Sequence, residues 1–168
     1  TCTKIILQTH DDNQKLIILF WLFYNLPYIC KDKQKPLIQM SFTEHCNEIF
    51  NQAIRDYHVT DSVDTPINNP YDRDSIENRL YLKCWIDTVQ WHYEDLIRDP
   101  HILPEDGMAL KRRIDHSNQD RTDLVEQIDS YFRQLNSDVN VLPNATINTE
   151  SQAWAVARLS NLDIKIKH

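Results

Sequence analysis

Hydrophobic residues recur with heptad-like spacing between Ala109 and Leu135, which predicts one long amphipathic helix. The stripe runs through Leu110, Ile114, Ser117, Arg121, Leu124, Ile128, Phe132 and Leu135. Two of its inner positions, Ser117 and Arg121, are polar. A buried guanidinium without a partner is strongly destabilising. Arg121 must therefore either meet carboxylates from a neighbouring helix or open onto a solvent-filled pocket.

The same periodicity predicts three further helices, with turn-forming prolines and asparagines between them. We expect helices over residues 43–58 and 75–98, from Pro104 or Glu105 to residue 135, and from Thr149 onward, where Thr149-Glu150-Ser151-Gln152 is a capping-box pattern. The helix over 75–98 carries a predicted core stripe of Leu82, Ile86, Val89, Tyr93 and Leu96. An up-and-down bundle of about four helices is the simplest all-α packing for such lengths.

The first 39 residues differ from the rest of the chain. They contain an apolar run over residues 16–30 that is short for a membrane span and is interrupted by Asn25 and Pro27. The run also lacks the flanks of a signal peptide. Met40 stands directly before Ser41-Phe42-Thr43-Glu44, another capping-box pattern. We therefore expect residues 1–39 to be an accessory extension or upstream-translated sequence, and residues 40–168 to form one helical domain with no membrane association.

Composition excludes several classes of function. The 168 residues include a single glycine, Gly107, so glycine-rich phosphate loops of the dinucleotide or P-loop kind are absent. The net charge is −7 and no strongly basic face stands out, so a nucleic-acid partner is not expected. The four cysteines are scattered without a close pair, which fits neither a zinc knuckle nor a disulfide framework and favours the cytoplasm.

A row of polar residues follows one side of the predicted helix over 75–98, next to its apolar stripe. The row consists of Asp87, Gln90, Trp91, Glu94 and Arg98. It is a natural partner for Arg121. In one interpretation, Asp87 or Glu94 pairs with Arg121 while Asn118 and Gln119 complete the hydrogen bonds, so that the layer is satisfied without a ligand.

In the other interpretation, the same layer lines a pocket between helices. His92, Trp91 and Arg113 would then add an aromatic platform and a second cation. A small anionic, phosphorylated or sugar-like ligand needs this combination of groups. The residues alone leave both interpretations open.

An acidic ladder on the 104–135 helix suggests an alternative function. Its members are Asp120, Asp123, Glu126 and Asp129. All-helical nucleotide pyrophosphatases hold magnesium with the Glu126-x-x-Asp129 spacing beside a second acidic helix. Asp123, Glu126 and Asp129 are thus candidate Mg²⁺ ligands of a nucleotide or sugar-phosphate hydrolase. The second acidic helix that such a site needs is incomplete, because Arg98 stands where a third acid is expected after Glu94-Asp95. The other explanation of the ladder is a solvated helix face.

Histidine spacing predicts no iron or zinc site. Di-iron sites in helical bundles use Glu-x-x-His twice, and none of the seven histidines has Glu or Asp three residues before it. We therefore expect no resident cofactor apart from the Mg²⁺ of the alternative function.

Three strings of the chain resemble a bacterial family, the domain of unknown function numbered 4254. They are LYLKCWIDTVQWHYEDLIR (80–98), KRRIDHSNQDRTDLVEQID (111–129) and INTESQAWAVARLS (147–160). The resemblance covers about residues 40–168 and none of residues 1–39. Positions that match the family pattern are Asp87, Gln90, Trp91, His92, Asp115, Asn118, Arg121 and Glu150. Positions that depart from it are Cys84, Gln152, Val156, Ala157 and Asn161.

The resemblance implies a small, cytoplasmic, all-helical protein without an established activity. It also implies a link to cell-envelope polysaccharide or lipopolysaccharide assembly, where family members accompany glycosyltransferases, and so favours a sugar-related ligand. The predicted ligand-binding set is Asp87, Gln90, Trp91, His92, Glu94, Arg113, Asp115, Asn118 and Arg121. Surface area left over on Trp85, Trp91 and Trp154 predicts a homodimer.

Overall fold

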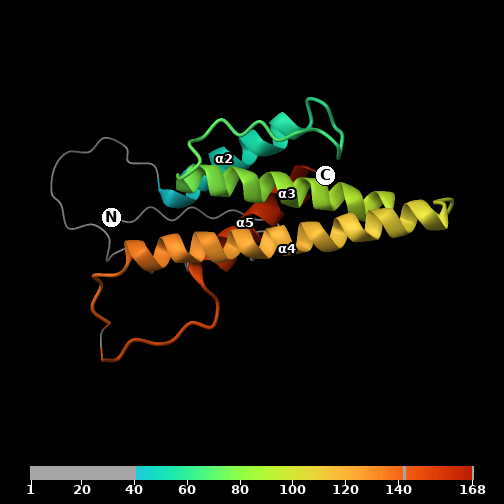
Figure 1. Cartoon of the computed structure of the whole chain (residues 1–168). Helices are drawn as coiled ribbons and strands as arrows, with labels where there is room; N and C mark the ends of the chain where they lie inside the picture. Colours follow the sequence, from blue (N-terminus) through green and yellow to red (C-terminus); the bar gives the residue numbers. More distant parts are fainter. Residues whose placement is uncertain (1–40, 142, 168) are drawn as a thin grey trace, which may run out of the picture.

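The computed structural model describes residues 41–141 and 143–167, and within them the chain forms helices and no strand. The helices are α2 (Phe42–Tyr57), α3 (Ile76–Leu96), α4 (Pro104–Leu135) and α5 (Gln152–Lys167), packed together as in Figure 1. This confirms the predicted all-α fold of four helices. The predicted extension over residues 1–39 and the start at Met40 lie outside the described residues. No helix of the described chain has the length and apolar character needed to cross a bilayer.

The direction of the helices corrects the predicted up-and-down order at its first pair. At the start of α2, His45 Nε2 lies 3.1 Å from Glu77 Oε1 at the start of α3, and at the end of α2 Tyr57 packs on Trp85 farther along α3. These two helices therefore run in the same direction. α4 runs back along α3, and Asn136 at its end bonds Gln152, where α5 begins.

The connection over residues 58–75 explains the shared direction of α2 and α3. α2 has 16 residues and is about 24 Å long. An extended chain spans roughly 3.3 Å per residue, so this connection is long enough to return to the start of α2 before α3 begins. In Figure 1 it passes beside α2 and α3. The short α3–α4 connection, in contrast, produces an antiparallel hairpin.

α3 is the most extensively packed helix, since it contacts α2 and α4 along much of its length and also packs against α5, which in turn touches all three other helices less extensively. α3 is consequently buried on several sides, with Leu80, Tyr81, Cys84 and Trp85 in the core. The predicted stripe of this helix is confirmed at Tyr93, which is buried, and at Val89, which packs against both hydrophobic clusters. It is wrong at Leu96, which is exposed, and Leu82 and Ile86 are half-buried and belong to neither cluster. A stripe analysis assumes one packed face, and a helix packed on several sides has more than one.

Local chemistry explains where the helices begin. Ser41 Oγ accepts from the Glu44 backbone N–H while the Glu44 carboxylate accepts from Ser41 N, which confirms this capping box. These hydrogen bonds lower the pKa of Glu44. α5 starts at Gln152, later than predicted, because Ser151 rather than Thr149 accepts the Trp154 backbone N–H, at 3.4 Å.

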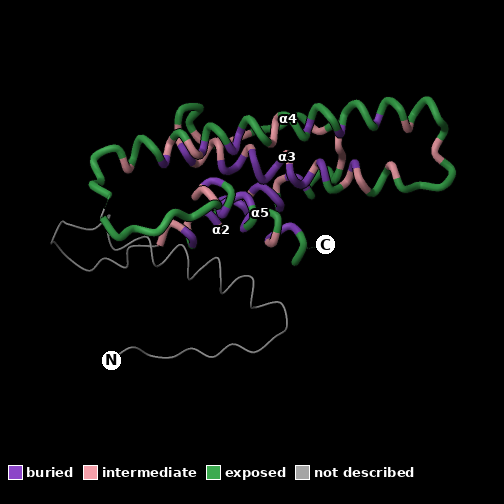
Figure 2. The backbone as a smooth tube through the Cα atoms, turned by 90° about the horizontal axis from the view of Figure 1, so that it is seen from below, coloured by how far each residue is buried: buried purple, intermediate pink, exposed green. Residues whose placement is uncertain are grey.

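The buried residues gather where all four helices meet, and the α3–α4 hairpin projects beyond that region (Figure 2). A second, smaller cluster of Tyr93, Leu110 and Ile114 holds the two helices together there. The heptad stripe of α4 is confirmed at its apolar positions except Leu135, which is 51% exposed at the helix end. Between the two clusters lies the polar layer.

Candidate functional site

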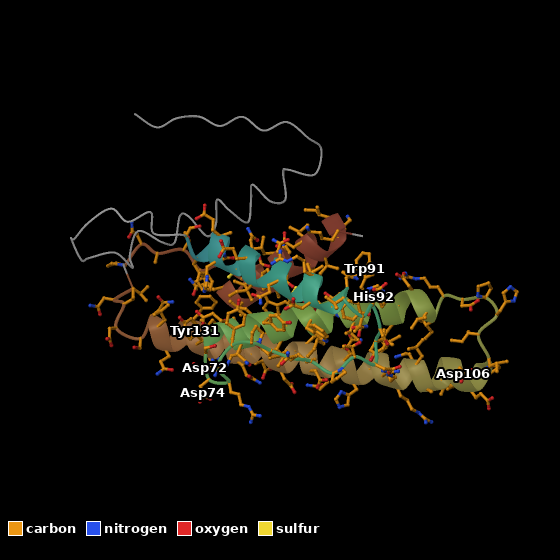
Figure 3. All side chains as sticks on the ribbon, turned by 90° about the horizontal axis from the view of Figure 1, so that it is seen from above. Asp72, Asp74, Trp91, His92, Asp106 and Tyr131 are labelled. Carbon is orange, nitrogen blue, oxygen red and sulfur yellow. The ribbon has the colours of Figure 1, made fainter. Side chains whose placement is uncertain are left out.

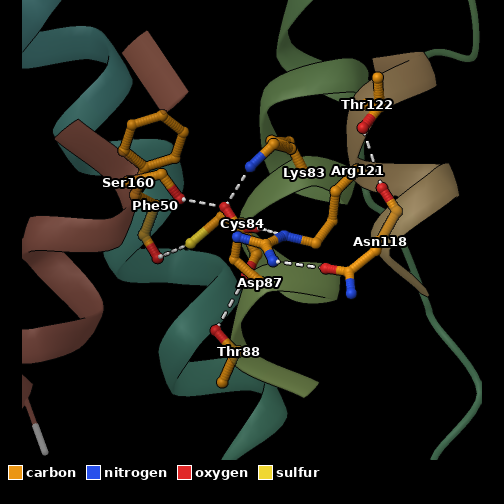
Figure 4. Close-up of polar contacts among 9 residues, drawn as sticks. All are labelled: Phe50, Lys83, Cys84, Asp87, Thr88, Asn118, Arg121, Thr122 and Ser160. Carbon is orange, nitrogen blue, oxygen red and sulfur yellow. Dashed lines mark hydrogen bonds and ion pairs between the residues drawn. The ribbon is translucent and has the colours of Figure 1, made fainter. Parts of the chain in front are cut away.

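Asp87, in the middle of α3, is the centre of the polar layer, and its carboxylate is fully shielded from solvent. It accepts hydrogen bonds from three helices (Figure 4). Lys83 Nζ donates to Oδ2 at 2.5 Å, Arg121 Nε donates to Oδ1 at 2.6 Å, and the Ser160 hydroxyl of α5 donates to Oδ2 at 3.2 Å. The layer therefore ties α4 and α5 to α3 through one carboxylate.

Arg121 has the partner that one of the two interpretations requires. It meets a carboxylate of the neighbouring helix, and this is Asp87 rather than Glu94. Arg121 also donates from a terminal nitrogen to Asn118 Oδ1 at 3.2 Å. Gln119 takes no part, since it bonds Asp123 on the outer face of α4.

Lys83 belongs to the layer although the sequence analysis did not select it. Its side chain is 3% exposed. Burial lowers the pKa of Lys83, and the nearby charge of Arg121 lowers it further, whereas Asp87 opposes both. The signal in the sequence is the i,i+4 spacing of Lys83 and Asp87, which places both on one side of α3. Two cations thus share one carboxylate.

Two neighbouring cavities flank Arg121 and share Asn118 and Asn161 as lining residues. The first, of about 460 Å³, lies against α5, and its remaining lining residues are Lys83, Thr122, Val125, Glu150, Trp154, Ala157 and Arg158. The second, of about 340 Å³, is also lined by Asp87, Gln90, Trp91, Glu94 and Arg98. Sequence reasoning missed the contribution of α5, because no pattern within one helix shows which face of another lies opposite.

Gln90 lines the second cavity, and only one of its two side-chain amide atoms has a hydrogen-bond partner among the described residues. Its Nε2 donates to Glu94 Oε1 at 3.2 Å. Its Oε1 is buried and has no hydrogen-bond partner among the described residues. A buried carbonyl oxygen without a donor is costly, so this atom is available to a ligand or a water.

Six of the nine predicted ligand-binding residues line the cavities at Arg121, and His92, Arg113 and Asp115 lie elsewhere. Arg113 bonds Asp64 at 2.6 Å, lies over the Tyr93 ring, and lines a separate cavity of about 570 Å³. Asp115 pairs with Lys111 on the exposed face of α4. His92 stacks on Tyr57 of α2, near the α2 end (Figure 3).

The acidic ladder follows the outer surface of α4. Asp120 lies 2.8 Å from His116, and Asp123 accepts from Gln119 at 2.7 Å. Asp129 pairs with Arg133, and Glu126 is exposed. Among residues 41–141 and 143–167, no group of three possible metal ligands includes a member of the ladder. Its neighbours are the basic and amide side chains of its own helix, as expected for a solvated face.

The two described cysteines are packing residues. Cys46 and Cys84 are completely buried, and burial raises the pKa of each thiol to about 12. The Cys84 thiol donates to the Phe50 carbonyl oxygen. A protonated, inaccessible thiol is a poor nucleophile.

A family model with the description "Protein of unknown function (DUF4254)" matches residues 77–168. The chain belongs to the DUF4254 family. This confirms the family resemblance, over a shorter stretch than residues 40–168. No curated protein and no solved structure matches the chain.

The DUF4254 match covers nearly all of α3 and the whole of α4 and α5, and it leaves α2 outside. Lys83, Asp87, Arg121 and Ser160 all lie within the matched residues. The cavities beside Arg121 are likewise lined entirely from the matched region. The polar layer is therefore a feature of the DUF4254 part of the chain.

Proposed function

We propose that the protein binds a small phosphorylated, sugar-like ligand in the cavity between α3, α4 and α5. The observation that carries this proposal is the charge of the polar layer. Lys83 and Arg121 share the single carboxylate of Asp87, and both cations line the cavity of about 460 Å³. When both are protonated, the layer has one positive charge in excess, and a bound anion would neutralise it.

The other walls of this cavity suit a polyhydroxylated ligand. Trp154 is 54% exposed, so one face of its indole is open for a sugar ring. Asn118 and Asn161 supply amides that can donate to and accept from hydroxyl groups. Arg158, paired with Glu150 at the rim, adds a further guanidinium. Aromatic and amide groups around a cation are typical of sites for phosphorylated sugars.

The biological role that we propose is an accessory one in the assembly of cell-envelope glycans. Sugar phosphates and nucleotide sugars are the substrates of such assembly, and their chemistry matches the cavity. This role rests on the family resemblance, whereas the ligand class rests on the charges and walls of the cavity.

The test is a thermal-shift titration of the full chain with inorganic phosphate, a hexose phosphate and a nucleotide sugar. A ligand present at 100 times its Kd adds about 2.7 kcal/mol of stability. Arg121→Met should abolish the shift and still fold, because Lys83 and Asp87 remain as a neutral pair. Arg133→Met is the matched control, since Arg133 is exposed on the same helix and pairs with Asp129.

Trp154→Ala separates the sugar from the phosphate. The exposed indole contributes little to the core, so the variant should fold and should keep its response to inorganic phosphate. The response to hexose phosphate should fall by up to about 10-fold in affinity, as the loss of roughly 0.5–1.5 kcal/mol of ring contact implies. The proposal fails if no phosphate compound stabilises the parent, or if Arg121→Met responds as the parent does.

A further inference from the structure

Three side chains with metal-ligating atoms gather where the chain leaves α2. His58 follows the last residue of α2, Asp61 lies one turn later, and His92 projects from α3. One ligand atom from each of them lies within 4.8 Å of the other two. In the part of the chain that the structure describes, this is the one group of three or more His, Cys, Asp or Glu residues that could hold a metal ion.

The backbone brings Asp61 back toward His58. Asp61 has a φ of 50°, in the left-handed region that aspartate tolerates better than most residues, and its N–H donates to the Tyr57 carbonyl oxygen at 3.0 Å. This turn places Asp61 Oδ1 2.9 Å from His58 Nδ1. A carboxylate and an imidazole are thereby held side by side by a four-residue segment.

The third ligand comes from a different element and is held by ring packing. The His92 imidazole stacks on Tyr57, with centroids 4.9 Å apart and 22° between the planes. It meets the His58 ring edge-on, at 5.6 Å and 75°. Tyr57 is in the core, so it provides a fixed support for His92 beside the more exposed His58 and Asp61.

We propose that His58, Asp61 and His92 bind one divalent transition-metal ion, with Zn²⁺ as the best match. Two imidazoles and one carboxylate are a common protein ligand set for Zn²⁺, and water takes the fourth tetrahedral position. Ligand atoms around tetrahedral zinc are roughly 3.3 Å apart, so the observed spacing needs only small rotations of the two surface side chains. The ion would fasten the start of the 58–75 connection to α3.

Spacing within the sequence could not reveal this group, because its members come from a helix end, a turn and a second helix. The other histidine–carboxylate pairs in the described chain, His45 with Glu77 and His116 with Asp120, do not gather a third ligand. The proposed metal site also shares no residue with the cavities at Arg121. It is therefore independent of the proposed anion binding.

The experiment measures Zn²⁺ stoichiometry by equilibrium dialysis, and the change in melting temperature, on the full chain carrying Cys2→Ser and Cys30→Ser. These substitutions remove the two thiols outside the described residues. The expected result is one Zn²⁺ per chain and a higher melting temperature. Asn tolerates the positive φ of position 61 as Asp does, so Asp61→Asn should keep the turn. It should weaken Zn²⁺ binding at least 10-fold. His92→Gln should do the same, whereas the control His116→Gln should bind as the parent does.

Far-ultraviolet circular dichroism without metal shows whether each variant is folded. If His92→Gln fails to fold, Asp61→Asn decides alone, since Asp61 is largely exposed and its substitution leaves the core intact. Absence of Zn²⁺ binding by the parent overturns the proposal. So does undiminished binding by Asp61→Asn, which would assign the ion to other histidines.

Discussion

The same ion pair occurs twice in this molecule, at the same helical spacing and in opposite surroundings. Lys83 and Asp87 pair at i,i+4 on α3 with side chains 3% and 0% exposed. Lys111 and Asp115 pair at i,i+4 on α4 with side chains 53% and 60% exposed. Sequence spacing treats the two as equal. The contrast teaches that the position of a pair in the packing decides whether its charges are structural, functional or merely solvated.

Physical chemistry makes the two pairs very different. An exposed i,i+4 pair is worth about 0.3–0.5 kcal/mol and is screened by salt. A buried pair has lost its hydration, so each charge depends on the partners that remain. Arg121 also pairs with Asp87, so the buried group contains two cations and one carboxylate. The exposed group is the simple pair of Lys111 and Asp115. We therefore propose anion binding at the first pair only.

The largest expected effect is the loss of the buried carboxylate. Asp87→Ala leaves Lys83 and Arg121 facing each other without a counter-charge, and it should lower the free energy of unfolding by about 3–5 kcal/mol. Asp115→Ala should change it by less than about 0.5 kcal/mol. Urea unfolding followed by circular dichroism measures both. If the two variants lost similar amounts of unfolding free energy, the proposed difference between the buried and the exposed pair would be wrong.

A second substitution tests whether the layer exists for stability or for binding. Replacing all three charges, as Lys83→Met, Asp87→Leu and Arg121→Met, removes the desolvation cost together with the attraction. We expect stability that is unchanged or up to about 4 kcal/mol higher, as found when buried ionic groups become apolar. Binding of phosphate compounds should disappear.

The result would be read from urea unfolding and a phosphate titration on the same sample. A stable triple variant that no longer binds shows that the charges are kept for a ligand. A large loss of stability would instead assign the layer to the architecture and remove the main support for the proposed function.

How far the sequence predicted the molecule depends on whether a feature lies within one helix or between several. Periodicity and capping chemistry within single segments predicted the four helices, and Ser41 and Pro104 mark their observed starts closely. The misfit of Arg121 with its apolar stripe also predicted, as one of two alternatives, a carboxylate partner on a neighbouring helix. Both inferences use local spacing plus the cost of burying an unpaired charge.

Features made by several helices escaped prediction. The shared direction of α2 and α3 depends on the path of residues 58–75, which no periodicity records. The placement of α5 brings Ser160 to Asp87 and Trp154 to the cavity beside Arg121. His92 stacks on α2, whereas its neighbour Trp91 lines the second cavity at Arg121. A helix packed on several sides hides these assignments, because each of its faces is partly apolar.

The pH dependence of stability should also differ between the buried and the exposed lysine pairs, with a smaller effect than the substitutions above. Burial lowers the pKa of Lys83 below its ordinary value of 10.5, which applies in the unfolded chain. Between the two values the unfolded chain holds more protons, so the free energy of unfolding rises with pH in that window, by at most about 1.4 kcal/mol per pH unit.

Lys83→Met should remove this rise, and Lys111→Met on the exposed pair should leave it unchanged. The measurement is urea unfolding of the three proteins at several pH values from 7 to 10, roughly the range below the ordinary lysine pKa. Equal slopes for the parent and Lys83→Met would mean that Lys83 is solvated in solution.

The smallest expected effects belong to the acidic ladder, and they separate the two functions that the sequence suggested. Asp123→Asn with Glu126→Gln alters exposed side chains whose surroundings are solvent and their own helix, so stability should change by less than about 0.5 kcal/mol. Phosphate-compound binding should also be unchanged, because neither residue lines the cavities at Arg121. A thermal-shift titration with and without Mg²⁺ measures both quantities. Loss of binding, or a Mg²⁺ response that this double variant abolishes, would move the site to the outer face of α4 and favour the metal-dependent hydrolase. Unchanged binding would favour the cavities at Arg121, because the acidic ladder would then contribute nothing to the ligand.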